Sequence, residues 1–422
     1  MIHVVRYAGS MKKNTRYVKK RMFKYFNEDG FRAEIKLISW WPVVYSCDDP
    51  NIAAENLSNQ LTKALDRWAP VRKVQIIPKY RPWVIKESKT LMKQRDYAQE
   101  LASSTSDPDD WRKFKNLRNT VVSRLRGEKN KWEKDQLNHL SNDSTNLWRN
   151  VKSWLGWKNS GPPTQLFINK IISKPKEIAD SMNHFFISKV KNLQKKLPEK
   201  KNDPLKHLKK IMKKRKSTFK FMPVSQDEVK EIVSNLKNSK ATGLDYIDTN
   251  TIKLVIDEIL PAITHVVNLS LMNQEFPLSY KQSKIIPLLK KPKDDPLITK
   301  FYRPVALLPI MSKILERAAF IQIEKYIETN NLLHPSHHGG RAWHSTTTAI
   351  IEMYDQWMEA VDKGNMAGCI MLDLSAAYDL ADHDLILKKL ELYGFEESSI
   401  SWMKSYLSNR SQCVYIDGVS FI

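Results

Sequence analysis

Asp373 ends an apolar run and is the residue of this sequence that most clearly could take part in catalytic chemistry. The run Cys369-Ile-Met-Leu-Asp373 predicts a buried β-strand with a carboxylate at its C-terminal end, and Tyr378 follows five residues later. Sheets packed against helices place ligands at the carboxyl ends of their strands. An Asp at a strand end is also a common turn former, so this position alone leaves a catalytic role and a turn equally open.

Basic side chains mark a second feature, a predicted β-hairpin. The runs Lys284 to Leu289 and Phe301 to Leu308 predict two strands joined by a turn that begins with Lys290 and Lys291. Arg303 lies on the return strand. Phosphate oxygens need several donors at once, so these three cations could bind a triphosphate. Exposed charges on an ordinary β-ribbon are the structural alternative.

The positive charge lies almost entirely in the first half of the chain. Of 422 residues with a formal charge of +23, residues 1–220 carry 49 Lys and Arg against 21 Asp and Glu, while residues 221–422 carry 20 against 25. This division indicates a docking surface for a polyanion, most plausibly nucleic acid, although a highly soluble ordinary domain also fits. The densest stretch, 189–220, fits a linker, an RNA contact or a nuclear localisation signal. Its central cations are Lys209, Lys210, Lys213, Lys214, Arg215 and Lys216.

Two glycine-containing loops add further candidate contacts. Lys240 lies in the loop Lys240-Ala-Thr-Gly-Leu-Asp245, which fits a phosphate contact or an ordinary helix C-terminal loop. Arg341 follows Gly339-Gly340 within a group of four histidines. Because no cysteine joins them and their spacing matches no common ligand pattern, we do not predict a zinc site there.

The cysteine count and the hydropathy limit the cellular compartments in which we expect this protein. Three cysteines lie far apart, which argues against a disulfide framework and for a reducing compartment. The sequence contains no apolar stretch of about 18 residues that could span a bilayer. We therefore expect an intracellular protein, in the nucleus or the cytoplasm, without a membrane partner.

Helix and turn signals divide the chain into three predicted regions of an α+β protein. Residues 1–160 are basic, mostly helical and contain nine of the twelve tryptophans, which pack between helices or stack on unpaired bases. Residues 161–220 form a Lys-rich extension with a helix opened by Pro175. Residues 221–422 begin with a capping box at Ser225 and end in a hairpin pattern on Asp417-Gly418.

Residues from about 225 onwards resemble the N-terminal part of a reverse transcriptase of the non-LTR (LINE-like) retrotransposon type. The matching stretches are Lys240 to Asp245, Tyr302 to Glu316, Gly339 to Thr346 and, most specifically, Leu372-Asp-Leu-Ser-Ala-Ala-Tyr-Asp-Leu-Ala-Asp-His-Asp384. Residues 1–220 more loosely resemble the basic region that such elements carry between endonuclease and polymerase. The resemblance implies RNA-directed DNA polymerase fingers and a partial palm of the right-hand type.

The same resemblance implies a role for each matching residue. Asp373 would bind two catalytic Mg²⁺ ions, and the carbonyl of Leu374 would complete one metal shell. Tyr378 would lie under the incoming sugar and exclude a 2′-hydroxyl. Lys290 or Lys291, with Arg303, would hold a deoxynucleoside triphosphate. The expected partners are an RNA template and a DNA primer, in a ribonucleoprotein; the oligomeric state is left open.

Departures from the family pattern and the position of the last residue qualify this expectation. Trp343 replaces a usual glycine, which could block a tight turn, and Leu244, His337, Gly340 and Ala376 also differ from the pattern. The sequence ends at Ile422, before the Gly-rich and aromatic-x-Asp-Asp motifs. We therefore expect the chain alone to be inactive. The alternatives are a non-catalytic RNA-binding relic of such an element and an unfolded fragment.

Overall fold

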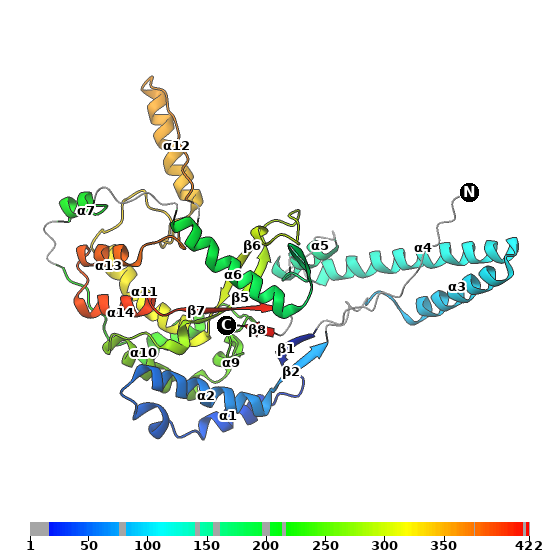
Figure 1. Ribbon diagram of the computed structural model, residues 1–422, viewed down its shortest axis with the longest axis horizontal. Helices are drawn as coiled ribbons and strands as arrows, with labels where there is room; N and C mark the ends of the chain where they lie inside the picture. Colours follow the sequence, from blue (N-terminus) through cyan, green and yellow to red (C-terminus); the bar gives the residue numbers. More distant parts are fainter. Residues whose placement is uncertain are drawn as a thin grey trace. The chain divides into compact units, whose positions relative to one another are not determined.

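The computed structural model describes residues 17–75, 82–139, 144–154, 161–195, 203–212, 217–374, 376–416 and 419–421. Within these ranges no helix is both long and apolar enough to cross a membrane. The described chain mixes helices with small sheets, as an α+β protein does (Figure 1).

The chain divides into two units. The smaller contains the described parts of 75–161 together with Leu289–Asp294, and the larger contains 18–74 and the described parts of 162–288 and 295–422. The larger unit therefore joins an early segment of the basic half to the later, mildly acidic half. The three regions predicted from the sequence remain a prediction.

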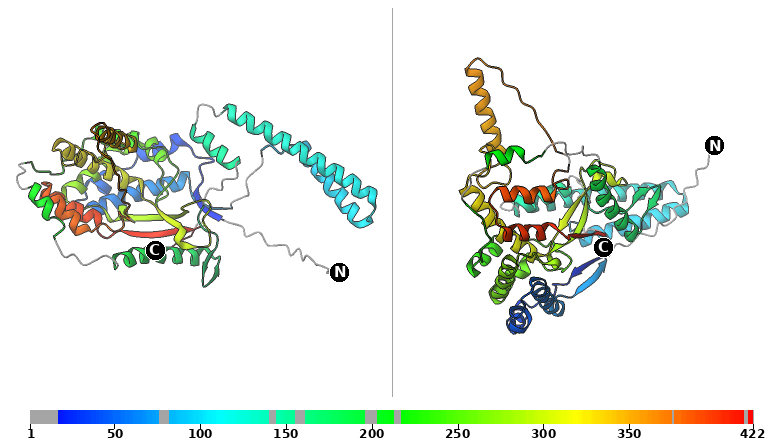
Figure 2. Two further views of the ribbon diagram at one scale, coloured as in Figure 1. Left: turned by 90° about the horizontal axis from the view of Figure 1, so that it is seen from above. Right: turned by 60° about the vertical axis from the view of Figure 1, so that its left-hand side comes forward.

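The smaller unit is built on two long antiparallel helices, α3 (Lys86–Thr105) and α4 (Pro108–His139), followed by α5 (Ser144–Trp154) (Figures 1 and 2). Ser106, at φ 58°, separates α3 from α4. The Oγ of Ser88 donates to Glu128 at 2.7 Å across the helix pair. The ring of Trp132 lies 5.3 Å from that of Trp83 and 6.1 Å from that of Trp154. Trp132 therefore packs against both of the other tryptophans.

Eleven described helices belong to the larger unit, and local signals account for several of their ends. Ser225 forms the predicted capping box with Glu228, and Pro175 opens its helix as expected. The helices are α1 (Glu28–Lys36), α2 (Pro50–Trp68), α6 (Pro175–Gln194), α7 (Lys206–Ile211), α8 (Gln226–Asn235), α9 (Thr249–Leu254), α10 (Ile256–Met272), α11 (Ile310–Thr329), α12 (Thr346–Asp362), α13 (His383–Leu392) and α14 (Glu397–Leu407); short π- or 3₁₀-helical turns lie at Trp41–Tyr45, Leu278–Lys281 and Thr299–Phe301.

A four-stranded sheet runs through the larger unit in the order β6-β5-β7-β8. β5 (Gln282–Leu289) pairs with β7 (Ser411–Ile416) in parallel, and β7 pairs with β8 (Val419–Phe421) antiparallel. β5 also neighbours β6 (Tyr302–Leu307), which confirms the predicted pairing of these two runs. Strands β7 and β8 likewise confirm the predicted C-terminal hairpin, whose turn residues 417 and 418 lie outside the described residues.

Helices cover both faces of this sheet. In the left view of Figure 2, α6 lies along one face, while α2, α10 and α11 lie on the other. Gln412 of β7 donates to Asn183 of α6 at 3.0 Å. Two smaller two-stranded sheets complete the unit: β1 (Tyr17–Arg21) with β2 (Val71–Gln75), and β3 (Leu166–Ile168) with β4 (Lys170–Ile172).

The core of the larger unit joins segments that are more than 200 residues apart in the sequence. Buried side chains of α1 and α2, such as Phe31 and Leu57, belong to the same apolar cluster as Ile263 of α10 and Trp402 of α14. Polar contacts reinforce the junction: the side chain of Asn51 donates to Glu275 at 2.8 Å and accepts from the backbone N–H of Leu278. Residues 18–74 are therefore part of this unit's core.

Gly243 brings two of the family-like stretches into close contact. A Cβ at this position would lie 2.7 Å from the backbone nitrogen of Pro309 and 3.0 Å from the carbonyl carbon of Leu308. The loop Lys240 to Asp245 can therefore approach the end of the Tyr302–Leu308 segment only because residue 243 has no side chain.

The substitution Gly243→Ala should lower the free energy of unfolding by about 2 kcal/mol or more, because the added methyl group meets backbone atoms that cannot rotate away. Denaturant unfolding would measure the change. Gly339→Ala is the matched control, since a Cβ there meets no atom within 4 Å. Equal effects of the two substitutions would contradict the close-packing explanation.

Candidate functional site

The Asp373 segment is not a strand in the structure, so the prediction of a buried sheet strand ending at Asp373 was wrong. Residues 365–374 are irregular, and Ile370, Met371 and Leu372 are between 83% and 88% exposed. A β-strand needs a neighbouring backbone to satisfy its N–H and C=O groups. β5 pairs directly with β7, and the described sheet contains no position occupied by this segment.

The other residues of the predicted metal and sugar site follow in an exposed turn. Leu374 is exposed, and Tyr378 is 98% exposed. The backbone N–H groups of Asp379 and Leu380 both donate to the carbonyl of Ala376, and α13 begins shortly afterwards with Asp382 as its N-cap. Asp373, Leu374 and Tyr378 therefore lie close in sequence on one exposed segment. Within the described ranges, no three His, Cys, Asp or Glu side chains are grouped closely enough to hold a metal ion.

The predicted triphosphate-binding residues lie at the connection between β5 and β6. Lys290 and Lys291 directly follow β5, Arg303 is the second residue of β6, and all three are exposed. The carboxylate of Asp294 accepts from the backbone N–H of Lys291 at 3.1 Å, which closes the first part of the turn. Their grouping around one triphosphate remains a prediction.

The predicted nucleic-acid contacts have different surroundings. Lys209 and Lys210 belong to α7, where the ammonium of Lys209 pairs with Asp203 at 2.7 Å. Lys213, Lys214, Arg215 and Lys216 lie outside the described residues. Arg341 forms two hydrogen bonds of 2.8 Å with the carboxylate of Glu328, so its fork already has an anionic partner.

The histidine-containing loop is tied to the first turns of α12. Nε2 of His338 lies 2.6 Å from Glu352, its Nδ1 lies 2.9 Å from Oγ1 of Thr348, and Ser336 donates to the other oxygen of Glu352. These contacts lower the pKa of Glu352, the hydrogen bond from Ser336 contributing most. Trp343 in this loop adopts φ 63° with its side chain 99% exposed. The turn forms with a tryptophan in the left-handed region that favours glycine.

A group of charged side chains that the sequence analysis missed lies around Arg21, which lines the same cavity as Lys240. Arg21 of β1 is 8% exposed, and its guanidinium donates to the carbonyls of Tyr246, Ala69 and Asp245 and to the carboxylate of Asp66. Burial raises the pKa of Asp245 to about 6, partly offset by a hydrogen bond from the N–H of Ile247 and by Arg21 and Lys284. No local pattern could reveal this group, because its members come from segments more than 200 residues apart.

Replacement of Trp343 by glycine should raise the free energy of unfolding by about 0.5–1 kcal/mol. Glycine removes the Cβ that disfavours the left-handed region, at some cost in backbone entropy, and the exposed indole loses little packing. Chemical denaturation would measure the gain. Trp343→Ala keeps the Cβ and should gain less; if it stabilises as much as Trp343→Gly, strain is not the cause.

Asp245→Asn should stabilise the protein more above pH 6 than below pH 4. Because the folded state raises the pKa of Asp245 from 3.8 to about 6, it binds the proton more tightly, and the free energy of unfolding falls as pH rises between these values. Asparagine cannot ionise, and it keeps the oxygen that accepts from Ile247 at 3.2 Å.

Thermal unfolding of wild type and Asp245→Asn at both ends of this pH window would test the expectation. Asp362→Asn, at the exposed end of α12, is the control substitution, because it removes an exposed carboxylate outside the Arg21 and Asp245 group. A constant difference between Asp245→Asn and wild type across the window would contradict the raised pKa.

Comparisons with known proteins identify relatives by sequence. No protein-family model matches the chain. The chain is 33% identical over 196 residues to the RNA-directed DNA polymerase from mobile element jockey of Drosophila funebris, covering 46% of this chain and 21% of the relative. It is 23% identical over 381 residues to the probable RNA-directed DNA polymerase from transposon BS of Drosophila melanogaster, covering 89% of this chain and 41% of the relative.

A third relative is the probable RNA-directed DNA polymerase from transposon X-element of Drosophila melanogaster, 29% identical over 188 residues, which cover 44% of this chain and 20% of the relative. The matches thus span between about a fifth and two fifths of the length of these relatives. They confirm the resemblance stated from the sequence motifs: this chain is related to the RNA-directed DNA polymerases of non-LTR mobile elements.

Proposed function

We propose that this chain contributes the fingers and part of the palm to an RNA-directed DNA polymerase of a non-LTR mobile element. The observation that carries the proposal is the similarity to polymerases of this kind together with the stretch Leu372 to Asp384, which contains a carboxylate and an aromatic at the family's spacing. The contact of Gly243 with Leu308 and Pro309 supports it, because it brings two further family-like stretches together.

Asp373 is the proposed metal-binding residue. Its carboxylate and the neighbouring carbonyl of Leu374 are oxygen donors, the ligand type that Mg²⁺ prefers, so the donor set fits this ion. Bound Mg²⁺ would stabilise negative charge on the attacking and leaving oxygens of a phosphoryl transfer. The exposure of Asp373 leaves its carboxylate accessible to such an ion.

The remaining proposed roles concern the incoming nucleotide. Lys290 or Lys291, together with Arg303, would donate hydrogen bonds to its phosphate oxygens, which orients the α-phosphate toward the primer hydroxyl. The ring of Tyr378 would pack under the sugar and leave no room for a 2′-hydroxyl. The RNA template, the DNA primer and the deoxynucleotide are the proposed partners, and the nucleus or the cytoplasm is the proposed location.

A second candidate function is RNA binding without catalysis. The charge distribution favours it, because residues 1–220 carry 49 cations against 21 anions, and cations bind phosphate backbones without regard to sequence. This function requires neither Asp373 nor Mg²⁺. The two candidates can therefore be separated by one substitution.

The polypeptide that contains this chain should extend a DNA primer on an RNA template in the presence of Mg²⁺, and Asp373→Asn should reduce the rate by about 10³-fold or more, because loss of a metal ligand removes several kcal/mol of transition-state stabilisation. Single-nucleotide extension would be measured at saturating nucleotide. Asp362→Asn is the matched control, an exposed carboxylate eleven positions earlier with no proposed role.

Extension that persists in Asp373→Asn would contradict the metal-binding role. A wild-type polypeptide that binds RNA with high salt dependence but does not extend a primer would favour the second candidate.

A further inference from the structure

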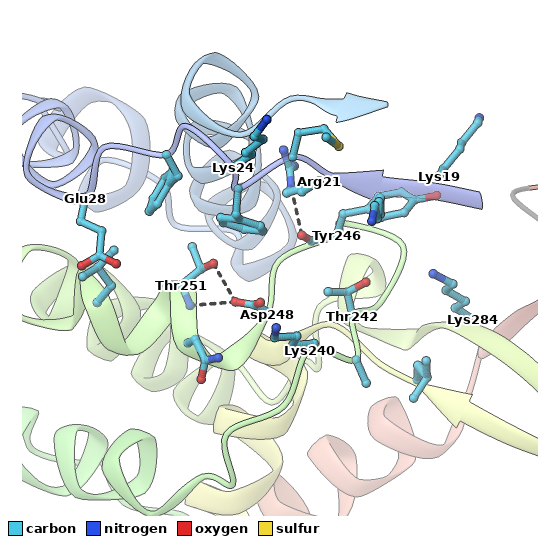
Figure 3. A pocket seen from close by; sticks show the side chains of 18 residues that line it. Lys19, Arg21, Lys24, Glu28, Lys240, Thr242, Tyr246, Asp248, Thr251 and Lys284 are labelled. Carbon is cyan, nitrogen blue, oxygen red and sulfur yellow. Dashed lines mark hydrogen bonds between the residues drawn. The ribbon is translucent and has the colours of Figure 1, made fainter. Parts of the chain in front are cut away.

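A basic cleft of about 870 Å³ lies within the larger unit, between the segment 19–28 and the segment 240–254, which contains a loop and α9. Figure 3 shows Lys19 and Lys24 on the N-terminal side of the cleft and Lys240 and Lys284 on the opposite side. Among the residues that the structure describes, only two acidic ones, Glu28 and Asp248, line it. Its cationic lining residues are Lys19, Lys20, Arg21, Lys24, Lys240 and Lys284.

The charged residues that line the cleft differ in whether they already have polar partners. Arg21 is held by backbone carbonyls, and Asp248 accepts hydrogen bonds from the N–H and the hydroxyl of Thr251 at 2.8 and 2.7 Å, as N-cap of α9. In contrast, the ammonium groups of Lys19, Lys20 and Lys240 have no ion pair with any described residue. The net positive charge of the lining is therefore available to a ligand.

Lys284 gives independent evidence for an anion. It is only 7% exposed, and its ammonium lies 4.0 Å from the ring centroid of Tyr415 and 4.9 Å from that of Tyr246. Burial lowers its pKa, while Cys413 and Asp245 oppose that change. Among the described residues, none accepts a hydrogen bond from this ammonium. An anion in the cleft would give this ammonium, which now faces only the two rings, a hydrogen-bond acceptor.

The neighbouring aromatics point to a nucleic-acid strand as the source of that anion. Phe23 lines the cleft and is 42% exposed, and Tyr25, with the ammonium of Lys24 4.9 Å from its ring, is 84% exposed. Lys19, Lys20 and Lys24 follow one another along a short segment, which suits a row of phosphates. Exposed rings interleaved with cations bind single strands by stacking on unpaired bases.

We propose that this cleft binds the phosphate backbone of single-stranded RNA, with Lys19, Lys20, Lys24 and Lys240 at its rim and the ammonium of Lys284 contacting one phosphate. The choice of RNA as the strand rests on the proposed function. The cleft itself combines the N-terminal segment with the family-like loop Lys240 to Asp245, and neither part forms it alone.

The test is RNA binding by the full chain, measured by fluorescence anisotropy with a labelled single-stranded RNA of about 15 nucleotides at several salt concentrations. The triple variant Lys19→Gln, Lys20→Gln, Lys24→Gln should bind at least about tenfold more weakly. The slope of log affinity against log salt should fall by about 2, because each lost phosphate contact on a single strand contributes about 0.7.

A charge-matched control separates the cleft from general electrostatic attraction. Lys325, Lys388 and Lys404 are exposed and line no part of the cleft. Their triple replacement by glutamine removes the same charge and should weaken binding by less than about threefold. Equal losses in the two triple variants, or no loss in the cleft variant, would overturn the proposal.

Lys284→Met tests the buried contact. Methionine keeps an unbranched apolar chain between Tyr246 and Tyr415, so the melting temperature should stay the same or rise, while RNA affinity should fall several-fold. Unchanged RNA affinity in a folded Lys284→Met would exclude its phosphate contact.

Competition and an active-site variant complete the design. A deoxynucleoside triphosphate should displace the RNA only weakly. If it displaces the RNA efficiently from the wild type and not from the cleft variant, the ligand of the cleft is a nucleotide and the proposal is wrong. Asp373→Asn should bind RNA as wild type does. Loss of polymerisation with intact, cleft-dependent RNA binding would therefore count against the proposed function and leave this inference standing.

Discussion

The buried guanidinium of Arg21 is the interaction on which the larger unit depends. It satisfies the carbonyls of Tyr246, Ala69 and Asp245 and meets the carboxylate of Asp66, so one side chain connects β1, the end of α2 and the loop after Lys240. A planar fork with five donors suits such a junction, because several acceptors can be satisfied at fixed angles. Tyr246, held at φ 56°, takes its position in the loop from this contact.

The same junction shows that the basic and the mildly acidic halves of the sequence are not separate parts of the structure. Along the chain, the basic and the mildly acidic halves meet near residue 220, which suggests separate parts. In the structure, residues 18–74 share a core with helices α8, α10, α11 and α14. The basic cleft exists because cations from the first segment face Lys240 and Lys284 from the second. The charge averaged over half of a sequence cannot show that these cations face one another, because their arrangement depends on which segments pack together.

In the Asp373 segment, the sequence motif indicates the family although the predicted structure of the segment was wrong. Its residue types and spacing suffice to recognise a family, because that information is local. Its predicted burial was wrong, because the burial of an apolar run depends on a neighbouring strand or helix that pairs with it. The exposed Ile370, Met371 and Leu372 are thus compatible with the motif and incompatible with the predicted sheet position.

Local signals in the sequence determined the elements whose ends depend on nearby residues. The capping box of Ser225, the helix opened by Pro175, the paired strands β5 and β6, and the hairpin of β7 and β8 were all predicted, since caps, turns and periodicity act over a few residues. Only the tertiary structure decided that Gly243 packs on Pro309, that Arg21 and Lys284 are buried, and that Asp245 is desolvated beside them. Burial and electrostatic partners there come from residues far apart in the chain, and the desolvation that shifts the pKa of Asp245 arises only when they pack.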